Sequence, residues 1–144
     1  MPLLLPLLLL ADPAPAACPT VAPPPAGFAG WATPGNRPGI GARFDVSGAL
    51  AVAGETAEER ARGGKAAAVE IDVPRAGTYA VALSDAAWID VNRNDKTQTS
   101  TGHDHGPACS GIRKIVAFAL VPGHYQLRLS GIKAPSIGVM IAPK

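Results

Sequence analysis

The chain has 144 residues, 47% of them hydrophobic, and a formal net charge of +2 at pH 7. Its basic residues are scattered and do not alternate with aromatic residues, which argues against nucleic-acid binding. The length suits one domain with a single core, and no apolar run reaches the roughly 20 residues of a transmembrane helix.

Residues 1–17 have the composition of a secretory signal peptide. Leu3 to Leu10 is all leucine except for Pro6, and small residues and prolines continue to Ala17. This order is typical of the apolar core and the cleavage region of such a signal. We therefore expect a periplasmic or secreted bacterial protein that begins near Cys18.

Cys18 follows the predicted cleavage site, and two fates are open to it. The sequence contains two cysteines, and an even count in an oxidising compartment predicts a disulfide between Cys18 and Cys109. Such a bridge would close a loop of about 90 residues and contribute about 4 kcal/mol by restricting the unfolded chain. The alternative is acylation of Cys18 as a lipoprotein anchor.

Residues 18–40 form a proline- and glycine-rich arm before the domain of residues 41–144. Proline lacks the N–H that a sheet or helix needs, so the arm is predicted to be neither. We expect Phe28 and Trp31 to pin the arm onto the domain. Trp31 is also a weak candidate for stacking against a sugar.

Short alternating runs follow from residue 42 onward, bounded by turn residues. Polar and apolar residues alternate plainly in Val69 to Val73 and in Tyr125 to Leu129, which predicts strands with one buried face. We expect an all-β fold, an antiparallel β-sandwich of jelly-roll or immunoglobulin-like kind with about 7–8 short strands in a single domain. The clearest predicted strands are 42–50, 67–73, 78–83, 88–91, 115–120, 125–130 and 137–141.

The acidic residues before the second strand allow a short helix. Thr56 and Glu59 have the spacing of a capping box, which would open one or two turns ending at Gly63 and Gly64; a charged loop is the equal alternative. We expect Glu55, Glu58, Glu59 and Glu70 in a solvated loop or on an exposed strand face. They therefore do not indicate a carboxylate pair for glycoside hydrolysis.

Two segments share one pattern, Ile71 to Leu83 and Ala119 to Ser130. Each reads as a strand, a Val-Pro turn, a glycine and a tyrosine that enters the next strand. We expect Tyr79 and Tyr125 to cover the edge of the core while each hydroxyl reaches a polar partner. The repeat favours a sandwich and says little about a ligand.

Trp88 begins the predicted strand 88–91, and the polar run of residues 92–96 predicts a hairpin turn after it. We expect Trp88 in the core. An exposed indole at this position would instead indicate a platform for a sugar.

The loop from Thr101 to Gly111 concentrates the side chains that bind metals, with two of the three histidines and one cysteine. In an extended chain, His103 and His105 project from the same face with Cβ atoms about 6–7 Å apart, close enough to share a Zn or Cu ion. His124 is the candidate third ligand, and Asp104 would point away unless the loop curls. The alternative is that these histidines are simply exposed.

No catalytic residue is predicted. Ser110 lies beside Cys109 and near His105, but the sequence around it lacks the glycines of a nucleophile elbow. Whether the chain is an enzyme stays open, with the balance against it.

The second half of the chain resembles a group of small exported bacterial proteins. The likeness rests on Gly77-Thr78-Tyr79, on Ala86 to Val91 and on the histidine loop from Ser100 to Lys114, and it covers roughly residues 74–141 together with the signal and the arm. The group has no established activity, and some members carry the name homogentisate 1,2-dioxygenase. That name would imply iron held by His103, His105 and His124, with Asp104 as the carboxylate.

Three functions follow from these patterns. The first is an exported binding or envelope-associated module, whose partner is a small molecule, a glycan or an envelope protein. The second is a metal-binding protein or small metalloenzyme built on His103 and His105. The third is a carbohydrate-binding accessory domain that uses Trp88 or Trp31.

Overall fold

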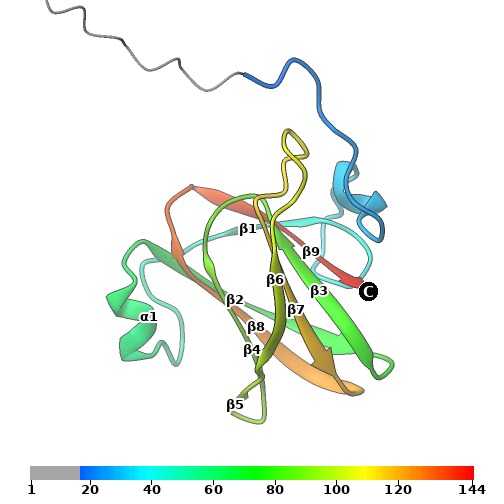
Figure 1. Cartoon of the computed structure of the whole chain (residues 1–144). Helices are drawn as coiled ribbons and strands as arrows, with labels where there is room; N and C mark the ends of the chain where they lie inside the picture. Colours follow the sequence, from blue (N-terminus) through cyan, green and yellow to red (C-terminus); the bar gives the residue numbers. More distant parts are fainter. Residues whose placement is uncertain (1–16) are drawn as a thin grey trace, which may run out of the picture.

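Two antiparallel sheets packed face to face form the protein (Figure 1). The computed structural model describes residues 17–144, so the predicted signal peptide lies outside the described residues except for Ala17. The strand order is β1-β9-β3-β7-β6 in the five-stranded sheet and β2-β8-β4-β5 in the four-stranded sheet. The predicted all-β sandwich is confirmed.

All seven predicted strand segments contain a strand, and two further strands are present. β5 and β6 are composed almost wholly of polar residues and glycine, so they lack the apolar alternation that marks the others. The strands are β1 Phe44–Ser47, β2 Lys65–Val73, β3 Gly77–Leu83, β4 Trp88–Arg93, β5 Lys96–Thr97, β6 Ser100–Asp104, β7 Lys114–Leu120, β8 Gly123–Ile132 and β9 Ser136–Pro143.

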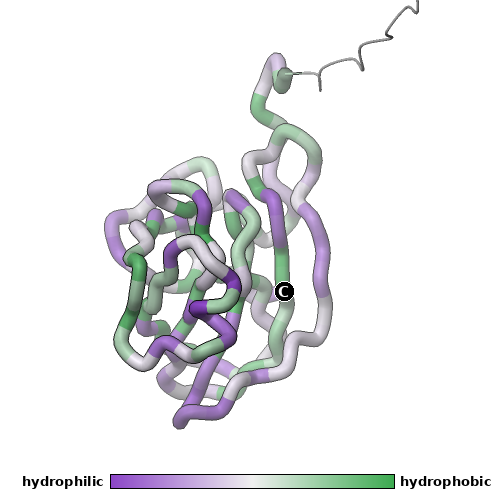
Figure 2. The backbone as a smooth tube through the Cα atoms, turned by 90° about the vertical axis from the view of Figure 1, so that its left-hand side faces the viewer, coloured by the Kyte–Doolittle hydropathy of each residue, from purple (hydrophilic) through white to green (hydrophobic). Residues whose placement is uncertain are grey.

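The main core lies between the sheets. The alternation of β2 and β8 is in register, since Val69 lies opposite Leu127 and Ile71 lies opposite Tyr125. Hydrophobic and hydrophilic residues alternate along the chain in Figure 2, as expected for strands with one buried face. The side chains that close the core from both sheets include Val81, Leu83, Val91, Phe118, Leu127, Leu129, Ile137 and Val139.

The two repeated Val-Pro turns have the same tyrosine contact. Tyr79 donates its hydroxyl to the carbonyl oxygen of Arg75 at 2.8 Å, and Tyr125 donates to that of Val121 at 2.9 Å. Both tyrosines are buried, at 4% and 1% exposure. The expectation that each ring covers the core while its hydroxyl reaches a polar group is confirmed.

The N-terminal arm covers the outer face of the five-stranded sheet. It contains a short 3-10 helix, η1 Ala29–Ala32, and buries Phe28 and Trp31. The sheet offers small side chains there, so two large rings fit against it: they pack with Ala80, Ala82, Ile112, Met140 and Ala142. The predicted anchoring role of Phe28 and Trp31 is confirmed.

A disulfide joins the start of this arm to the histidine loop. Cys18 and Cys109 are bonded across 91 positions of sequence, with Cα atoms 5.5 Å apart. The predicted pairing is confirmed, and the Cys18 thiol is therefore not free to carry a lipid anchor. No helix within residues 17–144 is long and apolar enough to cross a membrane.

A short helix, α1 Ala57–Ala61, lies over the outer face of the four-stranded sheet (Figure 1). Thr56 caps it, because its hydroxyl accepts the backbone N–H of Glu59 at 3.1 Å. The expectation that Glu59 is solvated is wrong: it is 5% exposed, as is Arg128 of β8. Two charge-assisted bonds of 3.0 Å to the Arg128 guanidinium satisfy its carboxylate, which is what permits this burial.

Candidate functional site

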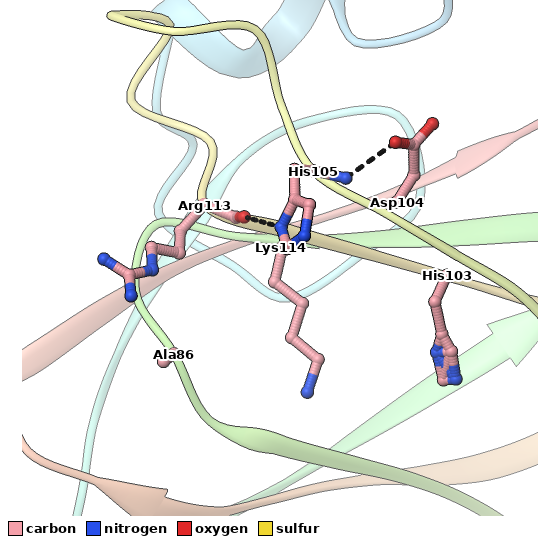
Figure 3. A pocket seen from close by; sticks show the side chains of 6 residues that line it. All are labelled: Ala86, His103, Asp104, His105, Arg113 and Lys114. Atoms are coloured by element: carbon pink, nitrogen blue, oxygen red, sulfur yellow. Dashed lines mark hydrogen bonds between the residues drawn. The ribbon is translucent and has the colours of Figure 1, made fainter.

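The histidine pair lies at one edge of the five-stranded sheet. His103 is in β6, opposite Val116 of β7, and His105 follows directly after the strand. Both imidazoles line an open hollow of about 400 Å³ with Ala86, Asp104, Arg113 and Lys114. Figure 3 shows the two rings on one side of the chain and the Asp104 carboxylate directed away from them.

The partners of these two histidines are local. His103 Nε2 is 3.3 Å from the hydroxyl oxygen of Ser100, three residues earlier in β6. His105 donates from Nδ1 to the carbonyl oxygen of Arg113 at 3.3 Å. The Asp104 carboxylate accepts the backbone N–H of His105 at 2.8 Å. These contacts fix the turn after β6 without joining the two rings to each other.

His124 lies in the other sheet, at the start of β8 and opposite Asp72 of β2. Its Nδ1 is 2.7 Å from the Asp72 carboxylate and its Nε2 is 2.6 Å from that of Glu70. Both carboxylates are acceptors, so they favour the imidazolium that donates from both nitrogens and raise the pKa of His124 above its ordinary value. It lines a separate hollow of about 250 Å³ with Glu70, Asn92, Asn94, Asp95 and Gln126.

The structure therefore does not bring His124 to the histidine pair. Sequence spacing could place His103 and His105 together, but His124 belongs to the other sheet. Within residues 17–144, no group of three or more His, Cys, Asp or Glu side chains is arranged to hold a metal ion. Cys109 is in the disulfide and has no thiolate to offer.

The two tryptophans differ sharply in exposure. Trp31 is 4% exposed, whereas Trp88 is 57% exposed, so the expectation of a core Trp88 is wrong. Side chains alternate along β4, and Ile89 and Val91 take the core side. Trp88 consequently points away from the core, and β5, with two residues, is too short to pair with this end of β4.

Two cations surround the exposed indole. The Arg62 guanidinium carbon is 4.6 Å from the centroid of the Trp88 ring, and Lys114 Nζ is 5.5 Å from it. Asp90 at 3.1 Å and the Ser130 hydroxyl at 2.9 Å accept hydrogen bonds from Arg62. Lys114 donates to the carbonyl oxygen of Ala87 at 2.7 Å. Both cations are therefore held in place beside the ring.

Shallow hollows extend from Trp88 in two directions. Trp88, Arg62 and Lys114 border both of them, one of about 230 Å³ and the other of about 220 Å³. The first adds Ala86, Ala87, Gly131 and Lys133. The second reaches His103 and includes Ile89, Asp90, Gln98, Ser100, Val116 and Phe118. We call the exposed surface around these two hollows the Trp88 surface.

Sequence reasoning did not find Arg62, Asp90, Lys114 or Ser130 as members of a site. Asp90 carried the only local signal, because it lies two residues after Trp88 and so shares its side of β4. Arg62 and Ser130 are 68 positions apart and meet only through the sheet topology.

Comparison with known proteins gives no assignment. No family model matches the chain, no curated protein sequence matches it, and no solved structure matches it. The resemblance to small exported proteins stays a prediction, and the function has to be argued from the geometry described above.

Proposed function

We propose that this chain is an exported β-sandwich binding module and that the Trp88 surface binds a glycan. The observation that carries the proposal is the 57% exposure of Trp88. A large exposed aromatic ring is costly to leave in water, and its flat face suits the C–H face of a sugar ring. Monomeric domains ordinarily bury such a ring, as this one buries Trp31.

The polar groups beside Trp88 match the needs of sugar hydroxyls. Asp90 supplies carboxylate acceptors, Gln98 supplies both a donor and an acceptor, and Arg62 supplies several donors. Arg62 is already fixed by Asp90 and Ser130. Binding would therefore cost little side-chain entropy at this position, which favours a recognition role.

Export rests on the predicted signal peptide and agrees with the disulfide. Disulfides persist in oxidising compartments and are rare where thiols are kept reduced. Cys18, which forms the disulfide with Cys109, directly follows the predicted cleavage region. A periplasmic or secreted location would also place the Trp88 surface where polysaccharides occur.

The test is a binding screen of the mature protein against soluble oligosaccharides, followed by calorimetry on the hits. Trp88→Ala should weaken binding by about 30-fold or more, the effect expected of a central aromatic contact. Leu50→Ala is the matched control, because Leu50 is 82% exposed and outside the site. Equal affinity of the Trp88→Ala variant and the parent protein would refute the proposal.

Tryptophan fluorescence gives an independent measurement. The chain has two tryptophans, so a Trp31→Phe variant leaves Trp88 as the single reporter. We expect its emission to shift to shorter wavelength when a sugar covers the ring, and we expect no shift in a Trp88→Phe variant that retains only Trp31.

The alternative proposal is a metal-binding protein that uses His103 and His105. Its support is that both imidazoles border one hollow. Two imidazoles alone are a weak site for Zn, Cu or Fe, which take additional protein ligands. Metal content of untagged protein, compared with that of a His103→Ala/His105→Ala variant, tests it: near-stoichiometric metal that disappears in the variant would favour this function over the glycan module.

A further inference from the structure

The Trp88 surface is rich in cations. Arg62 and Lys114 border both of its hollows, and Lys133 borders one of them. Lys114 and His103 also border the histidine hollow, which adds Arg113 and His105. Three hollows that share lining residues thus form one continuous surface with four arginine or lysine side chains.

Few carboxylates oppose these cations. Asp90 pairs with Arg62 at 3.1 Å, the exposed Glu58 lies 4.0 Å from the same guanidinium, and Asp104 accepts a backbone N–H of its own turn. Among residues 17–144, no carboxylate lies within ion-pair distance, 4.0 Å, of Arg113, Lys114 or Lys133. The surface therefore has positive charge to offer to a ligand.

The opposite end of the four-stranded sheet has the contrary character. The hollow around His124 includes Glu70 and Asp95, and Asp72 lies beside it. Arg93 and Lys96 lie at that end as well, so the two ends differ in their carboxylates, which gather around His124. A local field of one sign favours ligands of the opposite sign.

Like charges meet at the indole. Arg62 and Lys114 both approach the Trp88 ring, and burial together with the Arg62 guanidinium lowers the pKa of the Lys114 ammonium. An anionic group placed beside them would offset this repulsion. A neutral sugar would not.

We propose that the ligand of the Trp88 surface is an acidic glycan, one whose sugar ring stacks on Trp88 while its carboxylate or sulfate group contacts Lys114 and Lys133. This inference rests on the proposed glycan-binding function and adds the charge of the ligand. Lys and Arg are suited to both kinds of anion, so the experiment includes both.

The experiment compares an acidic ligand with its uncharged ester and adds a sulfated ligand. Calorimetry at low salt measures binding of a galacturonate oligosaccharide, of its neutral methyl ester and of a carrageenan oligosaccharide, which carries sulfate and no carboxylate. We expect at least one acidic oligosaccharide to bind about tenfold or more tightly than the ester, with the advantage falling as salt is added. Tighter binding of the galacturonate oligosaccharide indicates carboxylate as the anion, and tighter binding of the carrageenan oligosaccharide indicates sulfate.

Charge-neutral variants locate the effect. Lys114→Gln and Lys133→Gln should each weaken binding of the acidic oligosaccharide about three- to tenfold and reduce its advantage over the ester by a similar factor. Arg75→Gln is the matched control, because Arg75 is exposed in the turn at the far end of β3 and loses the same charge. Lys133 is also exposed, so its variant remains informative if Lys114→Gln folds poorly.

The outcomes separate this inference from the function on which it rests. If acid and ester bind equally and both require Trp88, the acidic preference is overturned and the glycan module stands. If no oligosaccharide binds, both fail. Vesicles containing phosphatidylglycerol serve as a third arm: if they bind and the oligosaccharides do not, and if vesicle binding survives Trp88→Ala, the acidic-glycan inference is overturned.

Discussion

The two tryptophans of this protein have similar neighbours and opposite environments. Each has an arginine against its ring, Arg43 at 4.8 Å from Trp31 and Arg62 at 4.6 Å from Trp88. Trp31 is nevertheless packed by the arm against an apolar patch of the five-stranded sheet, whereas Trp88 is 57% exposed. An arginine against an indole ring therefore does not by itself indicate a binding site. The exposure of the ring is what distinguishes a packing role from a binding role.

Replacing each tryptophan by alanine should separate these roles most strongly. Trp31→Ala removes a buried aromatic ring and should lower the free energy of unfolding by about 3–5 kcal/mol. Trp88→Ala removes an exposed one and should cost less than about 1 kcal/mol. Urea unfolding measures the free energy of unfolding of both variants and of the parent protein. A large loss of stability for Trp88→Ala would show that Trp88, like Trp31, has a structural role.

Removing the disulfide should loosen the arm around Trp31 and the histidine loop that carries Cys109. A Cys18→Ser/Cys109→Ser variant releases a loop of 91 positions and should lose about 4 kcal/mol of stability, or less if the arm detaches locally. Thermal unfolding with and without reductant measures this loss in the parent protein. Glycan binding at Trp88 should be unchanged in the variant; loss of binding would mean that the two regions are coupled.

The buried Glu59–Arg128 ion pair holds α1 on the sheet beside the Trp88 surface. Glu59→Gln leaves the buried Arg128 guanidinium without its counter-charge and should cost about 3 kcal/mol. Because Arg62 follows α1 directly, the Trp88 fluorescence should change as well. Glu55→Gln is the control, because the Glu55 carboxylate makes no ion pair among the described residues. The free energy of unfolding and the emission spectrum of that control should be close to those of the parent protein.

His124 should give the smallest effect, far from both tryptophans. Its pKa is raised in the folded state by Asp72 and Glu70, so the stabilisation is fully present below about pH 6.5 and is lost as the pH rises through the raised pKa. The stability difference between the parent and His124→Gln should therefore shrink toward alkaline pH. An NMR titration in which His124 titrates at or below 6.5 would contradict this.

Much of the fold could be predicted because the informative strands alternate. Val69 to Val73 and Tyr125 to Leu129 specify both a strand and its buried face, and the repeated Val-Pro turns specify how the chain reverses. β6 was missed because an edge strand has one neighbour and can be polar throughout. Its histidines were recognised from their chemistry and not from their secondary structure.

The candidate site was harder to predict because it depends on which strands become neighbours. The spacing of His103 and His105 predicted that both rings lie on one side of the chain, because that prediction needs only the local geometry of an extended segment. The outward direction of Trp88 follows from the local alternation of β4, but the cations beside its ring come from distant parts of the chain. The burial of Glu59 depends on Arg128, 69 positions away, and no local pattern contains that partner.

The place of β9 in the five-stranded sheet sets the order of events during synthesis. β9 lies between β1 and β3, so this sheet cannot close until residues 136–143 have left the ribosome. Cys18 likewise cannot form its disulfide until Cys109, 91 positions later, has been synthesised. Sheets that depend on such distant pairings form slowly. The core between the two sheets consequently stays incomplete until the last strand has been made.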